Sequence, residues 1–125
     1  MGPMRVDRPI LLVEDDAAIR DTVAECLQAE GYGVHALAHG AEALEWLRRE
    51  RPALLILDLV MPVMNGAEVL ERLRADPALR NLPVVLMTAA LPSRKAPLPP
   101  ADTILTKPFE LEQLLAAVAQ HCPRE

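Results

Sequence analysis

Five short apolar runs, separated from one another by helical patterns, constrain the fold of this chain more than any other feature of its sequence. The first, third and fourth runs are almost wholly aliphatic, which is typical of strands buried on both faces of a sheet. The second and fifth runs are weaker and indicate strands at flanking positions of the sheet. The five runs span residues 10–13, 33–37, 53–57, 84–87 and 103–105.

Amphipathic patterns lie between these runs, with apolar residues spaced by three and four positions. Asp16 is placed to cap the first helix, and Asp76 followed by Pro77 predicts one further short turn. Strands that alternate with helices of roughly ten to fifteen residues predict right-handed βαβ crossovers and a parallel sheet, which is the α/β class. The helices are predicted over about 16–30, 41–50, 66–75 and 110–121.

Residues 91–102 depart from this alternation. They read LPSRKAPLPPAD and contain four of the 12 prolines of the chain. Proline lacks a backbone N–H and clashes with the preceding helical turn. We therefore expect a loop or a single turn where the alternation calls for a fourth crossover helix.

The length and charge of the chain exclude several classes of protein. A chain of 125 residues corresponds to one domain with a sizeable core. We expect residues 9–123 to form this domain, after a disordered or tag-derived N-terminus at residues 1–8. No apolar run approaches the roughly 20 residues of a membrane-spanning helix, so we expect a cytoplasmic protein without membrane insertion. A net charge of −5 has the wrong sign for direct binding of nucleic acid. Cys26 and Cys122 have the spacing of neither a metal site nor a disulfide framework.

Polar side chains stand at the ends of four of the predicted strands. In an open parallel sheet, ligands bind beyond the carboxyl ends of the strands, where the strand order reverses. If these four strands are neighbours, several carboxylates, a hydroxyl and an ammonium group meet at one edge of the sheet. The residues are Glu14, Asp15 and Asp16 after the first strand, Asp58 after the third, Thr88 after the fourth and Lys107 after the fifth.

A cluster of carboxylates takes up protons unless a cation compensates the charge. Carboxylate oxygens without His or Cys favour Mg²⁺ over Zn²⁺, because Mg²⁺ prefers hard oxygen ligands and keeps several waters. A Mg²⁺ ion with a lysine nearby neutralises a phosphoryl group. An aspartate in that setting can act as a nucleophile and become an aspartyl phosphate.

Four motifs at these strand ends resemble those of the receiver domain of two-component response regulators. The resemblance extends from Ile10 to Cys122. It implies a flavodoxin-like (βα)5 fold, which is a doubly wound five-stranded parallel sheet in the order 2-1-3-4-5, here with a degenerate fourth helix. The motifs are Leu12-Val13-Glu14-Asp15-Asp16, the pattern D-x-x-M-P-x-M-x-G from Asp58 to Gly66, Met87-Thr88-Ala89, and Lys107-Pro108-Phe109.

The resemblance implies a role for each acidic residue. Asp58 is expected to be the phosphoacceptor. Glu14 and Asp15 are expected to be the acidic pair, with Asp15 closer to Mg²⁺ and Glu14 acting through water. The backbone carbonyl of Val60 is expected to be a further metal ligand. Asp16 is expected to cap the following helix instead of binding the metal.

The resemblance also implies roles at the later strands. Thr88 is expected to hydrogen-bond a phosphoryl oxygen, and Lys107 to pair with its charge. A cis peptide bond before Pro108 is expected to aim Lys107 into the site. Receivers usually have an aromatic residue three positions before this lysine, and here that position is Ile104. Ile104 and residues 91–102 both alter the face that receivers commonly use for output and dimerisation.

The resulting prediction is a signalling receiver domain that catalyses only its own phosphoryl transfer and dephosphorylation. Its phosphodonor is expected to be a histidine kinase or a histidine phosphotransfer protein, with no other small-molecule substrate. Because 17 residues follow the Lys107-Pro108 pair, we expect a stand-alone or excised receiver that acts on a downstream protein target.

Two other hypotheses start from the same sequence. The first is an interaction module that keeps the fold and never needs phosphorylation, and the altered segment 91–102 motivates it. The second is a cofactor enzyme of flavodoxin type. Acidic residues occupy the place of its phosphate-binding loop after the first strand, which argues against it.

Overall fold

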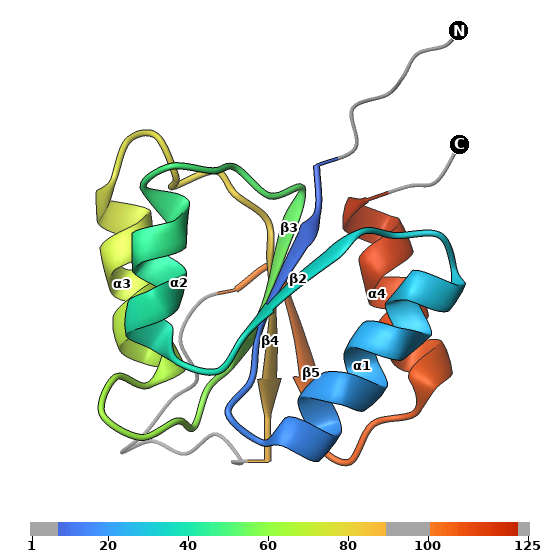
Figure 1. The fold of residues 1–125 in the computed structure, drawn as a ribbon. Helices are drawn as coiled ribbons and strands as arrows, with labels where there is room; N and C mark the ends of the chain where they lie inside the picture. Colours follow the sequence, from blue (N-terminus) through green and yellow to red (C-terminus); the bar gives the residue numbers. More distant parts are fainter. Residues whose placement is uncertain (1–7, 90–100, 123–125) are drawn as a thin grey trace, which may run out of the picture.

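The computed structural model describes residues 8–89 and 101–122 of the chain (Figure 1). Strands and helices alternate as the sequence predicts up to residue 88, and the next described element after that strand is again a strand. The elements are β1 (Ile10–Val13), α1 (Ala17–Ala29), β2 (Val34–Leu37), α2 (Gly40–Leu47), β3 (Leu54–Asp58), α3 (Gly66–Ala75), β4 (Val84–Thr88), β5 (Thr103–Thr106) and α4 (Leu111–His121).

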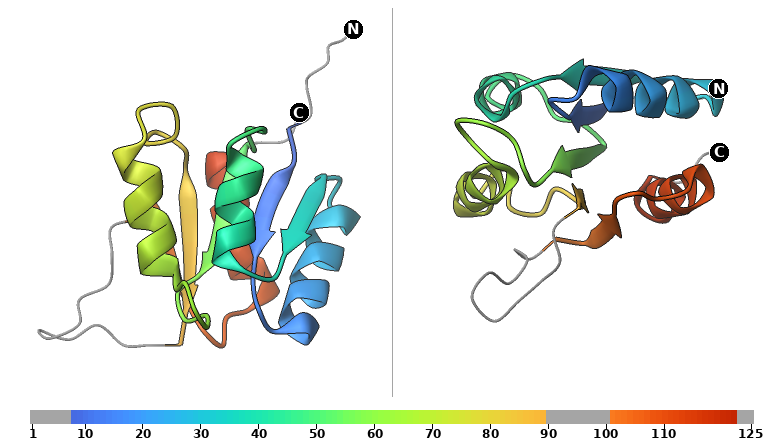
Figure 2. Two further views of the ribbon diagram at one scale, coloured as in Figure 1. Left: turned by 60° about the vertical axis from the view of Figure 1, so that its left-hand side comes forward. Right: turned by 90° about the horizontal axis from the view of Figure 1, so that it is seen from below.

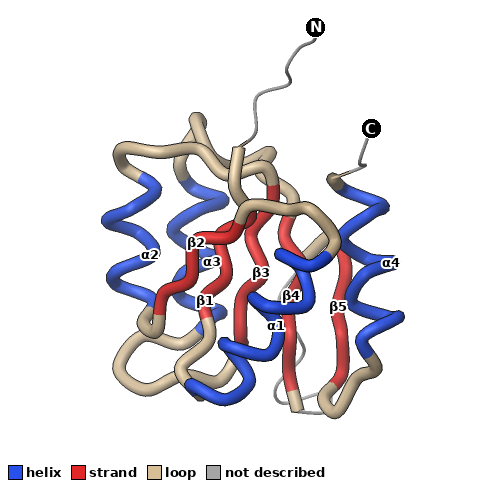
Figure 3. Tube along the Cα trace, turned by 45° about the vertical axis from the view of Figure 1, so that its right-hand side comes forward, coloured by secondary structure: helices blue, strands red, loops and turns tan. Residues whose placement is uncertain are grey.

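The strands form one parallel sheet in the order β2-β1-β3-β4-β5, which confirms the predicted order. Helices cover both faces of the sheet, with α2 and α3 on one side and α1 and α4 on the other (Figures 1, 2 and 3). The order reverses beside β1, because the chain moves outward to β2 and then returns to β3. This reversal is the point at which open parallel sheets bind ligands.

Successive residues of the central strands serve opposite faces of the sheet. Leu11 and Val13 of β1 belong to the core under α2 and α3, whereas Ile10 and Leu12 belong to the core under α1 and α4. Because side chains alternate along a strand, a strand covered on both faces needs apolar residues in succession, and the polar residues of β3 and β4 stand only at their last positions. All residues of β1, β3 and β4 are buried, whereas β2 and β5 are partly exposed. The two weaker runs are the edge strands.

Polar residues fix the helix ends that the sequence predicts. The Asp16 side chain accepts a hydrogen bond from the Ile19 N–H at 3.1 Å, so Asp16 caps α1. Asp76 caps the short turn after α3 by accepting from the Ala78 N–H at 2.9 Å. Each cap satisfies N–H groups that have no partner within the helix.

Helix α2 ends at Leu47, three residues before the predicted end at residue 50. The N–H groups of Arg48 and Arg49 donate to the carbonyls three residues earlier, at 3.2 and 3.1 Å. These tighter bonds close the last turn in 3₁₀ fashion. The prediction was wrong here because apolar spacing does not register a change in hydrogen-bond pattern.

The predicted degenerate fourth helix falls on residues 91–102, of which residues 91–100 lie outside the described residues. The described chain resumes at Ala101, and Asp102 fastens it to the rest of the domain. The Asp102 carboxylate accepts hydrogen bonds from the Val84 N–H at 2.7 Å and from Arg74 of α3 at 3.3 Å. The chain is thereby attached to β4 and α3 at the residue just before β5. None of the helices in the described part of the chain has the length and apolar character needed to cross a membrane.

Candidate functional site

The strand register brings the predicted site residues to one edge of the sheet. Asp58, the last residue of β3, lies opposite Met87 of β4, and Thr88 lies opposite Thr106 of β5. Glu14 follows Val13, which pairs with Leu57 immediately before Asp58. Four separate segments therefore end side by side at this edge.

Three carboxylates cluster there. One ligand oxygen from each of Glu14, Asp15 and Asp58 lies within 4.8 Å of the other two. Glu14 is fully buried and Asp58 is 3% exposed, whereas Asp15 is exposed. The two buried carboxylates follow buried strands, so the fold itself removes them from water.

Lys107, the residue after β5, joins this cluster. Its Nζ donates a hydrogen bond to Glu14 Oε1 at 2.9 Å and lies 3.3 Å from Asp58 Oδ1. Its backbone N–H donates to the Thr88 carbonyl at 2.7 Å, which fixes the segment after β5 against the end of β4. The peptide bond between Lys107 and Pro108 is cis, as the resemblance predicts.

One ammonium group does not balance three carboxylates. Burial, and then the charge of Glu14, raises the pKa of Asp58 to about 7, although Lys107 opposes this shift. Burial alone would lower the pKa of Lys107, but its hydrogen bond with Glu14 and the charge of Asp58 outweigh burial and raise it. The site therefore has excess negative charge, which an added cation would relieve.

The donor set fits a hard divalent cation. The clustered atoms are carboxylate oxygens, which Mg²⁺ and Ca²⁺ prefer, and the group includes no His or Cys that would favour zinc. The backbone after Asp58 lies close to its carboxylate, because the Val60 N–H is 3.4 Å from Asp58 Oδ1. The roles expected of the Val60 carbonyl and of the buried Thr88 hydroxyl stay predictions.

Asp16 stands apart from this group, as its predicted capping role requires. Its side chain caps α1, and its N–H donates to Glu14 Oε2 at 3.1 Å. Both oxygens of Glu14 are therefore occupied, one by Lys107 and the other by this N–H. That arrangement favours Asp15 as the more accessible ligand of the acidic pair.

Arg20 is a site residue that the sequence reasoning missed. Its Nη1 donates to the Glu14 carbonyl at 2.8 Å and contacts the Asp15 carbonyl at 3.5 Å. It therefore holds the backbone that carries both acidic residues. The sequence does carry a signal for this role, because Arg20 is a cation near the start of α1. The helix dipole disfavours positive charge there, so the Arg20 side chain needs hydrogen-bond acceptors nearby.

The loop after Asp58 explains the spacing of the second motif. A Cβ atom on Gly66 would lie 2.5 Å from the Asp58 carbonyl oxygen and 2.8 Å from the Leu59 Cα, so only glycine fits there. Met61 is buried in the core under α2 and α3. Asn65 and Glu68 form a capping box at the start of α3. Met61 and Gly66 of the motif thus have packing reasons, and Asn65 between its last two fixed positions caps the next helix.

The same loop contains one residue in an unfavourable conformation. Val63 has φ 68°, and the Met64 N–H donates to the Pro62 carbonyl at 2.7 Å across it. A hydrogen bond between residues two apart, around a residue with positive φ, forms a γ-turn, which is strained for a β-branched residue. The Val63 side chain is fully exposed, so no packing offsets the strain.

The family model of the response regulator receiver domain matches residues 10–119. Two relatives named Response regulator MprA, from Mycobacterium leprae and Mycobacterium ulcerans, are each 42% identical to the chain, over 112 and 110 residues. The matches cover 87% and 86% of this chain but 48% and 47% of the relatives. The chain therefore spans about half the length of the curated relatives it matches.

Solved structures share the fold over nearly the whole chain. The receiver domain of a signal transduction histidine kinase from Syntrophus aciditrophicus is 31% identical, with a TM-score of 0.82 over 90% of this chain and 88% of that one. Chemotaxis protein CheY4 of Vibrio cholerae is 30% identical, with a TM-score of 0.82 over 93% and 99% of the two chains.

A third structure is the receiver domain of the sensor histidine kinase PA1611 from Pseudomonas aeruginosa, with a magnesium ion coordinated in its active site cleft. It is 27% identical to this chain, with a TM-score of 0.84 over 93% and 98% of the two chains. The sheet order, the acidic cluster and the match of the family model lead to one conclusion. The chain belongs to the response regulator receiver domain family.

Proposed function

We propose that this chain is a phosphoacceptor receiver domain, comprising residues 9–123, in which Asp58 takes a phosphoryl group in the presence of Mg²⁺. The observation that carries the proposal is the position of the Asp58 carboxylate. It is buried at a strand end, within 4.8 Å of the carboxylates of Glu14 and Asp15 and 3.3 Å from the Lys107 ammonium.

The proposed reaction starts when an Asp58 carboxylate oxygen attacks the phosphorus of a phosphohistidine. An O–P bond forms, the N–P bond breaks, and the imidazole leaves with its electron pair. Glu14, Asp15, Asp58 and the Val60 carbonyl would hold Mg²⁺, which when bound neutralises charge on the phosphoryl oxygens. Lys107 supplies a second positive charge, and the Thr88 hydroxyl donates a hydrogen bond to a phosphoryl oxygen.

The proposed partners follow from this chemistry. A histidine kinase or a histidine phosphotransfer protein supplies the phosphoryl group in the cytoplasm, and a downstream protein reads the phosphorylated state. Exposed Val60 and Val63 follow Asp58 in the sequence and offer apolar surface for such protein contacts. The chain turns over no other substrate in this proposal.

Intact-mass measurement tests the proposal. Incubation with acetyl phosphate and Mg²⁺ is expected to add the mass of one phosphoryl group to the wild type and to Asp16→Asn. Asp58→Asn is expected to add none, and a chelator is expected to prevent the gain in the wild type. Labelling that persists in Asp58→Asn would contradict the assignment of the acceptor.

The same samples distinguish the phosphoacceptor from an interaction module that does not depend on phosphorylation. That alternative predicts that the wild type gains no phosphoryl mass, or that its affinity for a histidine phosphotransfer protein is the same with and without labelling. Residues 91–102, which motivated the alternative, lie almost wholly outside the described residues. The intact acidic site and Lys107 favour the phosphoacceptor.

A further inference from the structure

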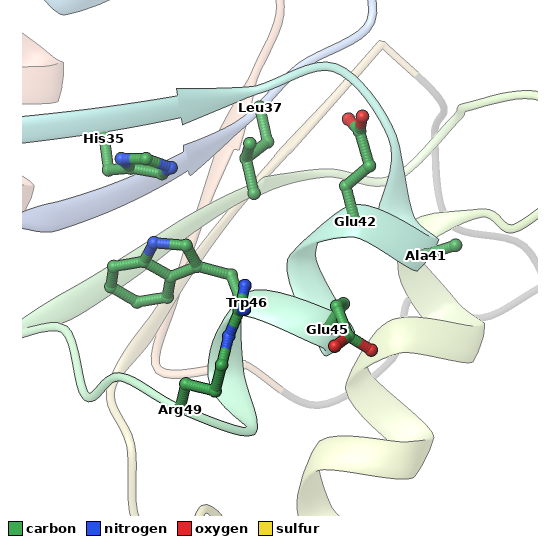
Figure 4. A pocket seen from close by; sticks show the side chains of 7 residues that line it. All are labelled: His35, Leu37, Ala41, Glu42, Glu45, Trp46 and Arg49. Carbon is green, nitrogen blue, oxygen red and sulfur yellow. The ribbon is translucent and has the colours of Figure 1, made fainter.

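A concave surface lies between β2 and α2 and shares no residue with the acidic site. It is an open hollow of about 640 Å³ at the edge of the sheet, because within the described chain β2 pairs only with β1. Its lining comes from both elements and from the turn after α2 (Figure 4). The lining residues are His35, Leu37, Ala41, Glu42, Glu45, Trp46 and Arg49.

The centre of this hollow is aromatic and already ordered. Trp46 is the only tryptophan of the chain, and its ring stacks on that of exposed His35, with centroids 5.2 Å apart and planes at 25°. Trp46 is partly buried and packs against the core under α2 and α3, as Leu37 and Leu44 do. A half-exposed tryptophan held by the fold is the kind of residue that occupies the centre of protein interfaces.

Charge is distributed unequally along the hollow. Glu42 and Glu45 lie along α2, whereas Arg49 lies in the turn beyond its end, where its N–H donates to the Trp46 carbonyl at 3.1 Å. Positions 42, 45, 46 and 49 are spaced by three and four residues, so they share one helical face. The face is therefore acidic at one end, basic at the other and aromatic between them.

We propose that this β2–α2 surface is the contact between two copies of this chain, related by a twofold axis. A uniformly basic or acidic partner would meet like charge at one end of the hollow, whereas a second copy meets opposite charge at both ends. If two α2 helices pack antiparallel around Trp46, Glu42 of one copy faces Arg49 of the other, twice. A twofold interface requires such a self-complementary surface.

The size of the surface sets the expected strength of association. Seven lining residues are far fewer than the roughly 20–30 residues per partner of a standard stable interface. The contact is therefore weak and transient, with a dissociation constant on the order of 100 µM. Raising the salt concentration should weaken it further, because both ion pairs are exposed to solvent.

Two variants with reversed charges test the proposal. Sedimentation equilibrium measures their self-association at protein concentrations from about 20 µM to about 1 mM, a range that includes the expected dissociation constant. Glu42→Arg alone and Arg49→Glu alone should each weaken self-association about tenfold, because like charges then face each other. Their equimolar mixture should recover wild-type association, because both cross-pairs are again opposite in sign. The matched controls are Glu71→Arg and Arg72→Glu on the exposed surface of α3, which change the net charge equally.

Three results would overturn the proposal: a wild type that is monomeric up to 1 mM, reversals that weaken association no more than the controls, or a mixture that does not recover. Circular dichroism establishes that each variant is folded. If a charge-reversed variant does not fold, Glu42→Gln and Arg49→Gln replace the pair. Each should then weaken association by a smaller factor, and their mixture should recover only part of it, because one of the two cross-pairs forms again.

Discussion

At the scale of single residues, the charge of Asp58 opposes folding when no metal is present. In the unfolded chain the Asp58 carboxyl group has its ordinary pKa of 3.8. In the folded chain the pKa of the same group is about 7, so the group keeps its proton to a higher pH. Between these two pH values the folded state binds the extra proton, so its stability falls as the pH rises, by at most about 1.4 kcal/mol per pH unit. Above pH 7 the loss is complete.

The fall in stability with rising pH gives the first prediction. In a chelator, Asp58→Asn should be more stable than the wild type at pH 8, by up to about 4 kcal/mol, and the difference should shrink towards pH 4. Urea unfolding across this pH range measures the difference in stability. Asp21→Asn, at an exposed position of α1, is the control. Addition of Mg²⁺ should stabilise the wild type more than Asp58→Asn. A difference that is independent of pH would contradict the explanation.

Arg20 is predicted to position the acidic pair. Without its hydrogen bonds to the Glu14 and Asp15 carbonyls, the loop after β1 loses its tie to α1. Arg20→Gln should therefore weaken Mg²⁺ binding several-fold, as measured by calorimetry, while phosphorylation at saturating Mg²⁺ stays near the wild-type rate. Arg72→Gln on exposed α3 is the control. Equal Mg²⁺ affinities in the two variants would show that Arg20 has no positioning role.

Val63 is predicted to cost stability through its backbone alone. Asn tolerates positive φ better than a β-branched residue, so Val63→Asn should stabilise the domain by about 1 kcal/mol. Val63→Thr introduces a polar group but remains β-branched, and it should leave the stability nearly unchanged. Thermal unfolding of both variants separates the backbone effect from surface polarity. Equal effects of the two substitutions would assign the change to polarity.

At the scale of elements, the start of α3 depends on the absence of one side chain. Gly66→Ala would place a methyl group against the backbone of Asp58 and Leu59, and should destabilise the domain by roughly 2 kcal/mol or more. Gly33→Ala is the matched control, because its nearest neighbour would be the Pro9 Cα at 4.0 Å. Denaturant unfolding should show little change for Gly33→Ala. Phosphorylation of Gly66→Ala should also slow, since the shift displaces Asp58.

The elements differ in how much of them the sequence could predict. Strand positions, the caps at Asp16 and Asp76 and the end of β3 at Asp58 follow from local patterns, because burial on both faces demands continuous apolar runs. The sheet order and the individual site roles came from the resemblance. The early end of α2 and the contact of Arg20 depend on hydrogen bonds that local periodicity does not determine.

At the scale of the whole molecule, signalling requires two states that bind a phosphoryl group differently. Ile104 stands where receivers usually have an aromatic residue, and it is 38% exposed. Its β-branched side chain is stiff about its first torsion, so it has fewer ways to repack than a ring that can swing inward. The response to phosphorylation should therefore be smaller around β5 than is usual for receivers.

Amide chemical shifts with and without beryllofluoride, a mimic of the phosphoryl group, measure this response. We expect larger changes in residues 16–20 and 60–66 than in residues 91–107. Ile104→Tyr should increase the changes in 91–107 if the missing aromatic ring is the cause. Changes concentrated in 91–107 of the wild type would contradict the prediction.

The attachment of Asp102 to Val84 and Arg74 has a consequence for protein engineering. Because the residue just before β5 is attached to β4 and α3, the position of Lys107 does not depend on the length of chain that joins the two strands. Lengthening a connection between fixed ends costs little, roughly 0.6 kcal/mol for each doubling. We therefore expect a longer chain between Ala89 and Ala101 to leave Lys107 and the acidic site in place.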